Sequence, residues 1–353
     1  MINQPYVLII GAGIYGSHAA MTLKKLGIIF KIADKNNDFF KESSSKNQNR
    51  LHLGFHYPRS YDTRQECING YTKFVNTYPF AAKNVPNNYY LIDKNSIIDY
   101  YTYKHIYTYE QIPFTEIDIL NIPFEFNKDN IYKSALLTQE RFIDPLELQT
   151  YFRTELDEFL IKNYDPKKLL ITETSITYNN EQFTHLFDCT YFQLTNNILK
   201  QPDIFYELCI SFLYKQKKYS KSIYAITIMD GPFLSFYPYN IDDQIYTLTD
   251  VEYTPLIKSN DIEDIYKLKN SITDEDIAVI NKKFEDKVTK YIPNFKKEFL
   301  RHGNYLSIKT KPNLLSDNRS LIHIKVNDSI HRFSGGKLTG IFSMENIIKD
   351  LFI

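Results

Sequence analysis

Residues 5–34, PYVLIIGAGIYGSHAAMTLKKLGIIFKIAD, predict a strand, a glycine turn, a helix and a second strand that ends in an acid. The apolar run 6–10 is typical of a strand that is buried on both faces of a parallel sheet. It leads into Gly11, Gly13 and Gly16, which form a G-x-G-x-x-G motif for a tight turn, a close approach of pyrophosphate and close helix packing. Because all these parts fall within about 30 residues, the length of one βαβ unit, the stretch predicts a dinucleotide-binding site.

The helix that we expect from Ile14 onward would point its free N–H groups and the positive end of its dipole at the phosphates. Gly27 suits the end of this helix. Asp34 follows the second strand, at the place where a carboxylate accepts hydrogen bonds from an adenosine ribose. Because a carboxylate would repel a 2′-phosphate, NAD or FAD is favoured over NADP.

Length and composition restrict the class of protein. A chain of 353 residues exceeds one ordinary hydrophobic core, so we expect two lobes. The 42 acidic residues balance 42 lysines and arginines, which gives no electrostatic footprint for nucleic acid or an anionic membrane. The chain has no apolar run long enough for a membrane span or a signal peptide. Its three widely spaced cysteines suit a reducing compartment. We therefore expect a cytoplasmic protein without a nucleic-acid partner, a membrane span or a metal site.

A second informative stretch is residues 47–59, NQNRLHLGFHYPR, which contains two histidines, two arginines, a tyrosine and a glycine. Buried polar groups need hydrogen-bond partners, and a ligand would supply them. Only histidine has an ordinary pKa near neutrality. His52, His56 and Tyr57 are therefore candidates for a catalytic base or for residues that orient the substrate.

The motif GAGIYG, residues 11–16, combined with residues 47–59 resembles the FAD-dependent oxidoreductases of the D-amino acid oxidase type, including glycine oxidase and L-2-hydroxyglutarate oxidase. In the hydroxyglutarate enzymes a similar segment passes under the isoalloxazine. Five residues of this chain fall on it: Asn47, His52, Gly54, Tyr57 and Pro58. Asn49 stands where that family usually has glycine, and Tyr191 replaces a second family glycine near the phosphates.

The resemblance implies an α/β fold in which an inserted, mostly antiparallel α+β substrate domain covers a Rossmann-like FAD-binding domain of the glutathione reductase type. A helix with Asp144 as its N-cap and Pro145 at its first position would return the chain to the FAD-binding domain. We place the FAD-binding domain at 1–88, 143–200 and 301–353, and the substrate domain at 89–142 and 201–300.

Near the carboxyl end, SGGKLTG at residues 334–340 predicts a second glycine turn that opens a terminal helix and offers backbone N–H groups to an anion. In the resembled family this loop meets the ribityl chain and the N1/C2=O side of the flavin, where Lys337 would add positive potential. Residues 308–320 resemble a family segment that often supplies an arginine toward the substrate, here Arg319.

These motifs and the resemblance together give a set of predicted site residues. The predicted FAD contacts are Gly11, Gly13, Ile14, Tyr15, Gly16, Asp34, Lys35, Ser45, Asn47, Arg50, Leu51, Ile176, Gly335, Gly336, Lys337, Leu338 and Thr339. The predicted catalytic residues are His52, His56, Tyr57, Arg59 and Arg319. Among them Arg50, Arg59 and Arg319 are candidates for holding an anionic group through bidentate hydrogen bonds.

The resemblance implies oxidation of a C–N or C–O bond by hydride transfer to flavin N5, with oxygen or another electron acceptor. The substrate would be small, polar and anionic: an amino acid, a 2-hydroxy acid or a sugar derivative. One alternative is a UDP-galactopyranose mutase-like enzyme, which residues 53–56 and 333–338 resemble, and which needs paired tyrosines and two arginines that face each other. The other is a non-catalytic FAD-binding protein, in which Asn49 and Tyr191 distort the site.

Overall fold

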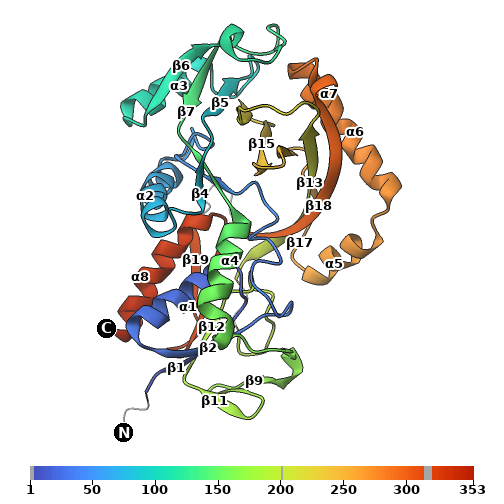
Figure 1. The fold of residues 1–353 in the computed structure, drawn as a ribbon. Coiled ribbons are helices and arrows are strands. Elements are labelled where there is room, and N and C mark those ends of the chain that lie inside the picture. Colours follow the sequence, from blue (N-terminus) through green and yellow to red (C-terminus); the bar gives the residue numbers. More distant parts are fainter. Residues whose placement is uncertain (1–3, 200–201, 314–319) are drawn as a thin grey trace.

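Two sheets stacked end to end build the molecule, which is described here from a computed structural model for residues 4–199, 202–313 and 320–353. The five-stranded sheet has the order β19-β20-β12-β1-β2 and lies in the lower half of Figure 1 together with both chain ends. All its neighbouring strands are parallel except the edge pair β19 and β20. The strands are β1 (Tyr6–Ile10), β2 (Ile29–Ala33), β12 (His185–Asp188), β19 (Leu321–Lys325) and β20 (Ile330–Gly335).

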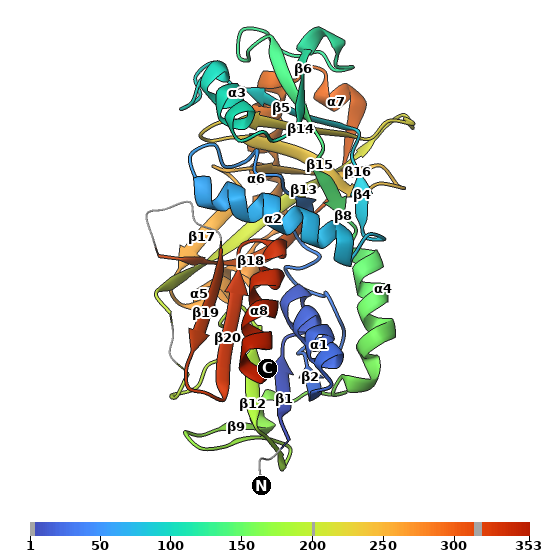
Figure 2. The same cartoon turned by 90° about the vertical axis from the view of Figure 1, so that its left-hand side faces the viewer.

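The predicted strand, glycine turn, helix and second strand are confirmed in this sheet. Helix α1 (Ile14–Leu26) follows β1 and ends at Gly27, whose φ of 69° is left-handed. Figure 2 shows α1 beside the terminal helix α8 (Ile341–Phe352), and a buried hydrophobic cluster lies between these helices and the sheet. The two ends of the chain therefore share one core.

The upper, nine-stranded sheet is mostly antiparallel, as predicted for the second lobe. Its path is β17-β13-β16-β15-β14-β5-β7-β6, and β18 pairs with β13; only the β14 and β5 pair is parallel. Helices α3 (Tyr100–Tyr109), α5 (Ile262–Ser271), α6 (Asp274–Tyr291) and α7 (Phe295–Glu298) surround it. The strands are β5 (Asn87–Ile92), β6 (Phe114–Asp118), β7 (Ser134–Thr138), β13 (Ile204–Gln216), β14 (Tyr224–Met229), β15 (Leu234–Asn240), β16 (Ile245–Asp250), β17 (Pro255–Ser259) and β18 (Phe299–Pro312).

The strand β18 departs from our division of the chain. We assigned residues from 301 onward to the FAD-binding domain, whereas β18 pairs with β13 along the length of both strands. Residues 301–312 thus extend the upper sheet, and the chain returns to the lower sheet at β19. An alternating strand pattern does not indicate which sheet a strand joins, so this pairing could not be predicted from residues 299–312. The other predicted domain boundaries stay a prediction.

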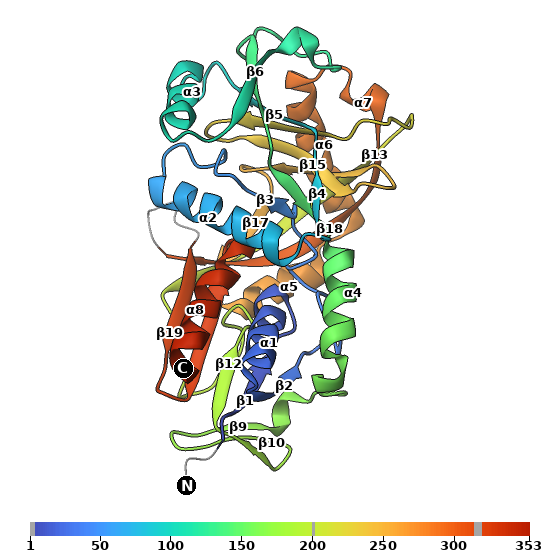
Figure 3. The same ribbon diagram turned by 60° about the vertical axis from the view of Figure 1, so that its left-hand side comes forward.

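Between the two sheets lie the pieces that connect them. Helix α2 (Tyr61–Thr77) crosses the middle of the molecule in Figure 2, and α4 (Pro145–Leu156) runs alongside α1 in Figure 3. The Asp144 side chain accepts from the Leu146 and Glu147 amides, as predicted for the N-cap of α4. A small sheet contains β3 (Arg50–Leu51), β4 (Ala82–Asn84) and β8 (Arg141–Ile143), and a hairpin sheet contains β9 (Leu169–Ile171), β10 (Ile176–Tyr178) and β11 (Glu181–Phe183).

A membrane-spanning helix is not found among the described residues, since none of their helices is long and apolar enough to cross a bilayer.

Candidate functional site

The first glycine turn has the backbone that its motif predicts. Gly11 has a φ of +102°, a backbone conformation that residues with a side chain rarely adopt. A Cβ at this position would also lie 2.7 Å from the Cys189 carbonyl oxygen, so both the backbone and the packing require glycine. The Ala12 amide donates to Asp34 Oδ2 at 2.8 Å. Asp34 therefore holds the turn with one carboxylate oxygen, and the end of β12 lies directly against the turn.

The start of α1 is capped by a residue that the sequence analysis missed. The Ile14 amide donates to Ser44 Oγ at 2.9 Å. Ser45, which we predict as an FAD contact, donates to the Glu42 carbonyl at 3.2 Å, and its predicted role stays a prediction. A run of three serines indicates a loop that can cap a helix, but not which serine does so. Lys35 lies further out, with Nζ 3.5 Å from Glu42 Oε1.

The second glycine turn packs against the first helix. The Tyr15 hydroxyl donates to the Lys337 carbonyl at 2.8 Å, and a Cβ at Gly335 would overlap that hydroxyl oxygen. The two ends of the chain are therefore joined through one tyrosine. In the same turn Gly336 is exposed, whereas the Thr339 side chain packs on Gly70 of α2.

The two positions at which this chain lacks a family glycine keep a glycine-like backbone. Asn49 has a φ of +50° and Tyr191 a φ of +59°, both in the left-handed region. The Asn49 amide donates to Asn47 Oδ1 at 2.5 Å, and asparagine tolerates this conformation better than most residues. The substitutions therefore change the side chains at these points without changing the type of backbone conformation.

Arg50 has a different place from the one we predicted. Its side chain is buried, with the guanidinium 3.8 Å above the Tyr237 ring centroid and Nη1 3.1 Å from Glu140 Oε2. It also donates to Asn88, Tyr90, Thr227 and Ser235. Since these groups occupy both terminal nitrogens, Arg50 is not available for a bidentate bond to a ligand. The neighbouring Leu51 side chain is buried in the core.

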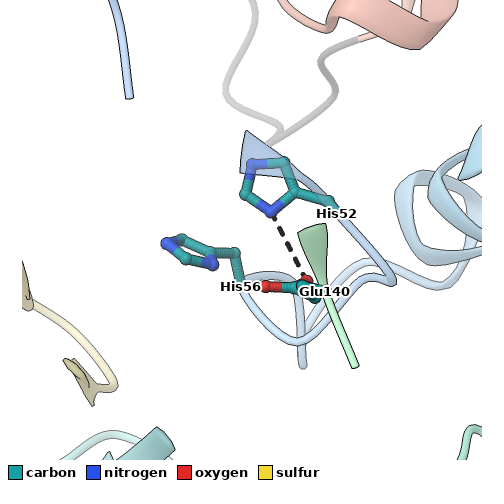
Figure 4. A group of neighbouring side chains, drawn as sticks. All are labelled: His52, His56 and Glu140. Atoms are coloured by element: carbon teal, nitrogen blue, oxygen red, sulfur yellow. Dashed lines mark ion pairs between the residues drawn. The ribbon is translucent and has the colours of Figure 1, made fainter. Parts of the chain in front are cut away.

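His52 and His56 meet at Glu140, as Figure 4 shows. The two imidazole centroids are 4.7 Å apart with the rings nearly perpendicular. His52 Nδ1 lies 3.7 Å from Glu140 Oε1, and His56 Nδ1 lies 2.5 Å from the Tyr90 hydroxyl. Burial and the positive charge of Lys337 lower the pKa of His52 to about 3. Burial and Arg50 lower the pKa of His56 well below its usual range, so both rings are neutral near pH 7.

Glu140 is the central residue of this cluster, and sequence reasoning missed it. It lies between the short strands β7 and β8, where a lone acid is typical of an exposed turn, yet it is buried. Burial alone would raise the pKa of Glu140, but His52, Arg50 and the Tyr90 hydroxyl lower it to about 2. The cluster His52, His56 and Glu140 has metal-ligating atoms within 4.8 Å of one another. Donors from Arg50, Leu53 and Tyr90 already surround the carboxylate, so we interpret it as a hydrogen-bonded cluster.

Lys337 brings a positive charge to the second glycine turn. Its side chain is buried, and Nζ contacts the Tyr57 hydroxyl and lies 3.9 Å from the Tyr57 ring centroid. Within the described part of the chain it has no carboxylate at ion-pair distance. A buried ammonium group without a counter-charge is costly, so this position fits an anionic or strongly polarised ligand group.

The remaining predicted residues lie apart from this cluster or outside the described residues. Arg59 Nε lies 3.2 Å from Oδ2 of Asp230, the residue that follows β14. Ile176 is buried in the hairpin sheet and packs in the cluster around Leu8. Arg319 falls in 314–319, outside the described residues.

FAD fits the residues that the structure brings together. The first turn brings its backbone to a helix N-terminus at Gly11 and Gly13, where a Cβ would clash with Cys189 and Ser44, and Asp34 has the position of a ribose-binding acid. The second turn presents Lys337 with no carboxylate partner among the described residues. One end of the chain would hold the dinucleotide and the other would face the polar atoms of the ring.

Comparison with known proteins gives relatives over nearly the whole chain, although no family model matches. A protein named FAD-dependent monooxygenase FPY4 from Fusarium mangiferae is 28% identical and covers 97% of this chain and 89% of its own length. The FAD-dependent monooxygenase kojA of Aspergillus flavus is 25% identical and covers 98% of this chain and 85% of its own length. Both agree with the predicted cofactor, FAD, and the predicted class of enzyme, an FAD-dependent oxidoreductase.

Solved structures match the fold at low sequence identity. Glycine oxidase from Geobacillus kaustophilus superposes with a TM-score of 0.74 at 9% identity, covering 98% of this chain and 94% of its own. NikD, an amino acid oxidase, gives a TM-score of 0.73 at 11% identity, covering 99% of this chain and 94% of its own. The predicted resemblance and fold class are confirmed. The chain has the fold of the FAD-dependent oxidoreductases of the D-amino acid oxidase and glycine oxidase type.

Proposed function

We propose that this chain binds FAD between its two glycine turns and oxidises a C–N or C–O bond of a small polar substrate. The main support is the hydrogen bond between Tyr15, near one end of the chain, and Lys337, near the other. At this contact the Lys337 side chain is buried, has no carboxylate partner among the described residues, and lies close to the two neutral histidines His52 and His56. Such a site can bind a polarised ring system and accept a proton.

Bound FAD would supply the hydride acceptor at N5, with oxygen or another molecule as the final electron acceptor. The side chains of this chain have three tasks. The backbone at Gly11 and Gly13 would contact the phosphates, Lys337 would stabilise negative charge on the ligand, and neutral His52 or His56 would take up a proton. No described residue has the arrangement of a nucleophile triad at this site.

The anionic character of the substrate is less supported than the oxidation itself. We predicted three arginines for an anionic group, but Arg50 is committed to Glu140 and Arg59 lies against Asp230. Arg319 lies outside the described residues. We therefore propose a polar substrate with a hydroxyl or amino group next to the oxidised carbon, and do not require a negative charge on it.

Monooxygenation is a second candidate, favoured by the names of both curated relatives. The same residues would bind the cofactor, and the difference would lie in the product. An oxidase forms hydrogen peroxide, whereas a monooxygenase places one oxygen atom of O2 in its product and reduces the other to water with two electrons from a reductant such as NAD(P)H.

The two earlier alternatives find less support. A mutase-like site needs two arginines that face each other, and the described arginines of the site, Arg50 and Arg59, each contact an acid. A non-catalytic protein was favoured if Asn49 and Tyr191 distorted the site, but both keep a left-handed backbone.

The test is an anaerobic titration of the purified protein with pooled amino acids, 2-hydroxy acids, other alcohols and amines, and sugar nucleotides. We expect a visible flavin spectrum that bleaches with one pool. Each pool is then incubated under ¹⁸O2 with and without NAD(P)H as reductant, and the product is analysed. Peroxide without ¹⁸O in the product supports the oxidase, and incorporated ¹⁸O supports the monooxygenase. A flavin that bleaches only with dithionite would contradict the proposed oxidation.

A further inference from the structure

The Tyr90 hydroxyl connects Glu140 to His56. It lies 2.6 Å from Glu140 Oε2, 2.5 Å from His56 Nδ1 and 2.9 Å from Arg50 Nη1. Tyr90 belongs to β5, Glu140 follows β7, and His56 lies in the 47–59 segment. Three segments that are distant in sequence thus meet at one phenol oxygen.

The protons of this group can be counted. A phenol has one proton to donate and two lone pairs to accept. Glu140 is ionised and can only accept, so the Tyr90 proton points to it. Arg50 can only donate, and its N–H fills one lone pair. His56 must then donate Nδ1–H to the other lone pair. Because the ring is neutral, its Nε2 carries no proton.

The groups that face His56 from the packed elements favour this neutral form. They are Arg50, His52, Tyr57, Tyr90, Glu140 and Lys337. Arg50 and Lys337 are both positive, and Glu140 is already paired with Arg50 at 3.1 Å. The edge of the ring also packs against Phe233, with centroids 5.2 Å apart. These charges therefore keep His56 Nε2 unprotonated near pH 7, so that it is free to accept a proton in the reaction and to release it afterwards.

We propose that Glu140 and Tyr90 are positioning residues that fix the proton of His56 on Nδ1 and thereby make Nε2 the base of the reaction. This inference rests on the proposed function. With FAD bound, the substrate O–H or N–H proton would pass to His56 Nε2, the adjacent C–H bond would break with its electron pair leaving as hydride to the flavin oxidant, and a C=O or C=N bond would form. Oxygen, or another acceptor, restores the oxidant.

The chain contains a second tyrosine–glutamate pair that serves as a control for Tyr90 and Glu140. Tyr100 donates to Glu116 Oε1 at 2.6 Å, the same kind of tyrosine and glutamate pair, but on α3 and β6 and without a histidine. Glu116 is also paired with Lys104. Tyr100→Phe therefore removes a tyrosine–glutamate hydrogen bond of the same length, to a more exposed carboxylate, without touching the proposed base.

The first test reads the tautomer without any turnover. The FAD-loaded protein is labelled with ¹⁵N-histidine, and His56→Gln assigns the His56 ring signals among the eight histidines. We expect protonated Nδ1 and unprotonated Nε2 in the wild type, with no titration at the ordinary histidine pKa of 6.5. Tyr90→Phe should shift the tautomer and Tyr100→Phe should not. Protonated Nε2 in the wild type, or an unchanged tautomer in Tyr90→Phe, would overturn the proposal.

The second test uses the substrate pool that bleaches the wild type. We expect His56→Gln to lower kcat by roughly 10²-fold or more, the usual contribution of a general base. Tyr90→Phe should lower kcat with little change in KM, and Tyr100→Phe should leave both unchanged. A Tyr90→Phe enzyme with a shifted tautomer and wild-type kcat would overturn the positioning role. If the wild type itself reduces with no pool, the proposed function fails, while the tautomer measurement still stands on its own.

Discussion

At the scale of single residues, the site is organised around a buried carboxylate and a buried guanidinium. Arg50 and Glu140 have almost no exposed side-chain surface, and each satisfies several other polar groups. Removing one member of such a pair leaves an uncompensated buried charge, which is far more costly than removing both. The pair therefore constrains the positions of β3, β5 and the segment that carries both histidines.

The pair Arg50 and Glu140 should show strong thermodynamic coupling. We expect Arg50→Met or Glu140→Leu alone to lower the free energy of unfolding by about 3–5 kcal/mol, and the double variant to lose less than the sum. Denaturant unfolding measures all four proteins. Lys104→Met at the half-exposed pair with Glu116 is the control, and it should cost at most about 1 kcal/mol. Additive losses at Arg50 and Glu140 would contradict the coupling.

The pH dependence of stability follows from the same carboxylate. The pKa of Glu140 is about 2 in the folded protein and lies near 4.5 when its environment is ordinary. A carboxyl group whose pKa is lower in the folded than in the unfolded protein stabilises the fold at pH values above its unfolded pKa. This stabilisation is lost as the pH falls toward its folded pKa. We expect the free energy of unfolding to decrease from about pH 5 to pH 2, and Glu140→Gln to weaken that slope. An identical slope in the variant would rule out this role.

At the scale of elements, two glycine turns and one tyrosine join the ends of the chain. Gly335→Ala should push Tyr15 away and lower the free energy of unfolding by about 1–3 kcal/mol, the usual cost of overpacking. Tyr15→Phe removes the overlapping oxygen, so the double variant should lose less than the two single losses combined. Gly303→Ala, where a Cβ meets no neighbour within 4 Å, is the control. Thermal and denaturant unfolding would distinguish these outcomes.

The turn at Asn49 gives a second prediction at this scale. Asn49→Gly should leave stability within about 1 kcal/mol of the wild type, because glycine adopts the left-handed backbone readily. Asn49→Val should lower it by about 1–2 kcal/mol more, since a β-branched residue is strained there. Both variants lose the same side-chain amide, so their difference isolates the backbone. Equal stabilities would show that the turn relaxes.

Several of these elements were predictable because their signals are local. The glycine spacing at 11–16 and the Asp144 and Pro145 pair specify a turn and a helix start through neighbouring residues alone. Glu140 was not predictable in this way, because its partners Leu53 and Tyr90 lie 87 and 50 positions away in sequence. The pairing of β18 with β13 is a long-range choice of the same kind.

At the scale of the whole molecule, residues 47–59 and α2 connect a lower sheet, built from both chain ends and β12, to an upper sheet built from the middle of the chain (Figure 1). Tyr57 and Lys337 come from opposite ends of the chain and meet at this connection. The arrangement explains why the sequence predicted the cofactor motifs more fully than the substrate side. Each glycine motif is continuous in sequence, whereas the buried cluster around Arg50 and Glu140, which we propose lies on the substrate side, takes its residues from β5, β14 and β15.

The most direct measurement is FAD binding to the apoprotein, followed by flavin fluorescence, for the wild type, Lys337→Gln and the control Lys287→Gln. Lys287 is another largely buried lysine, but it pairs with Asp250 at 2.6 Å in the upper lobe. We predict one FAD per chain, affinity about tenfold weaker in Lys337→Gln because a charge-assisted contact is lost, and wild-type affinity in Lys287→Gln. A protein that binds no FAD, or equal affinities in all three, would contradict a cofactor site built from both ends of the chain.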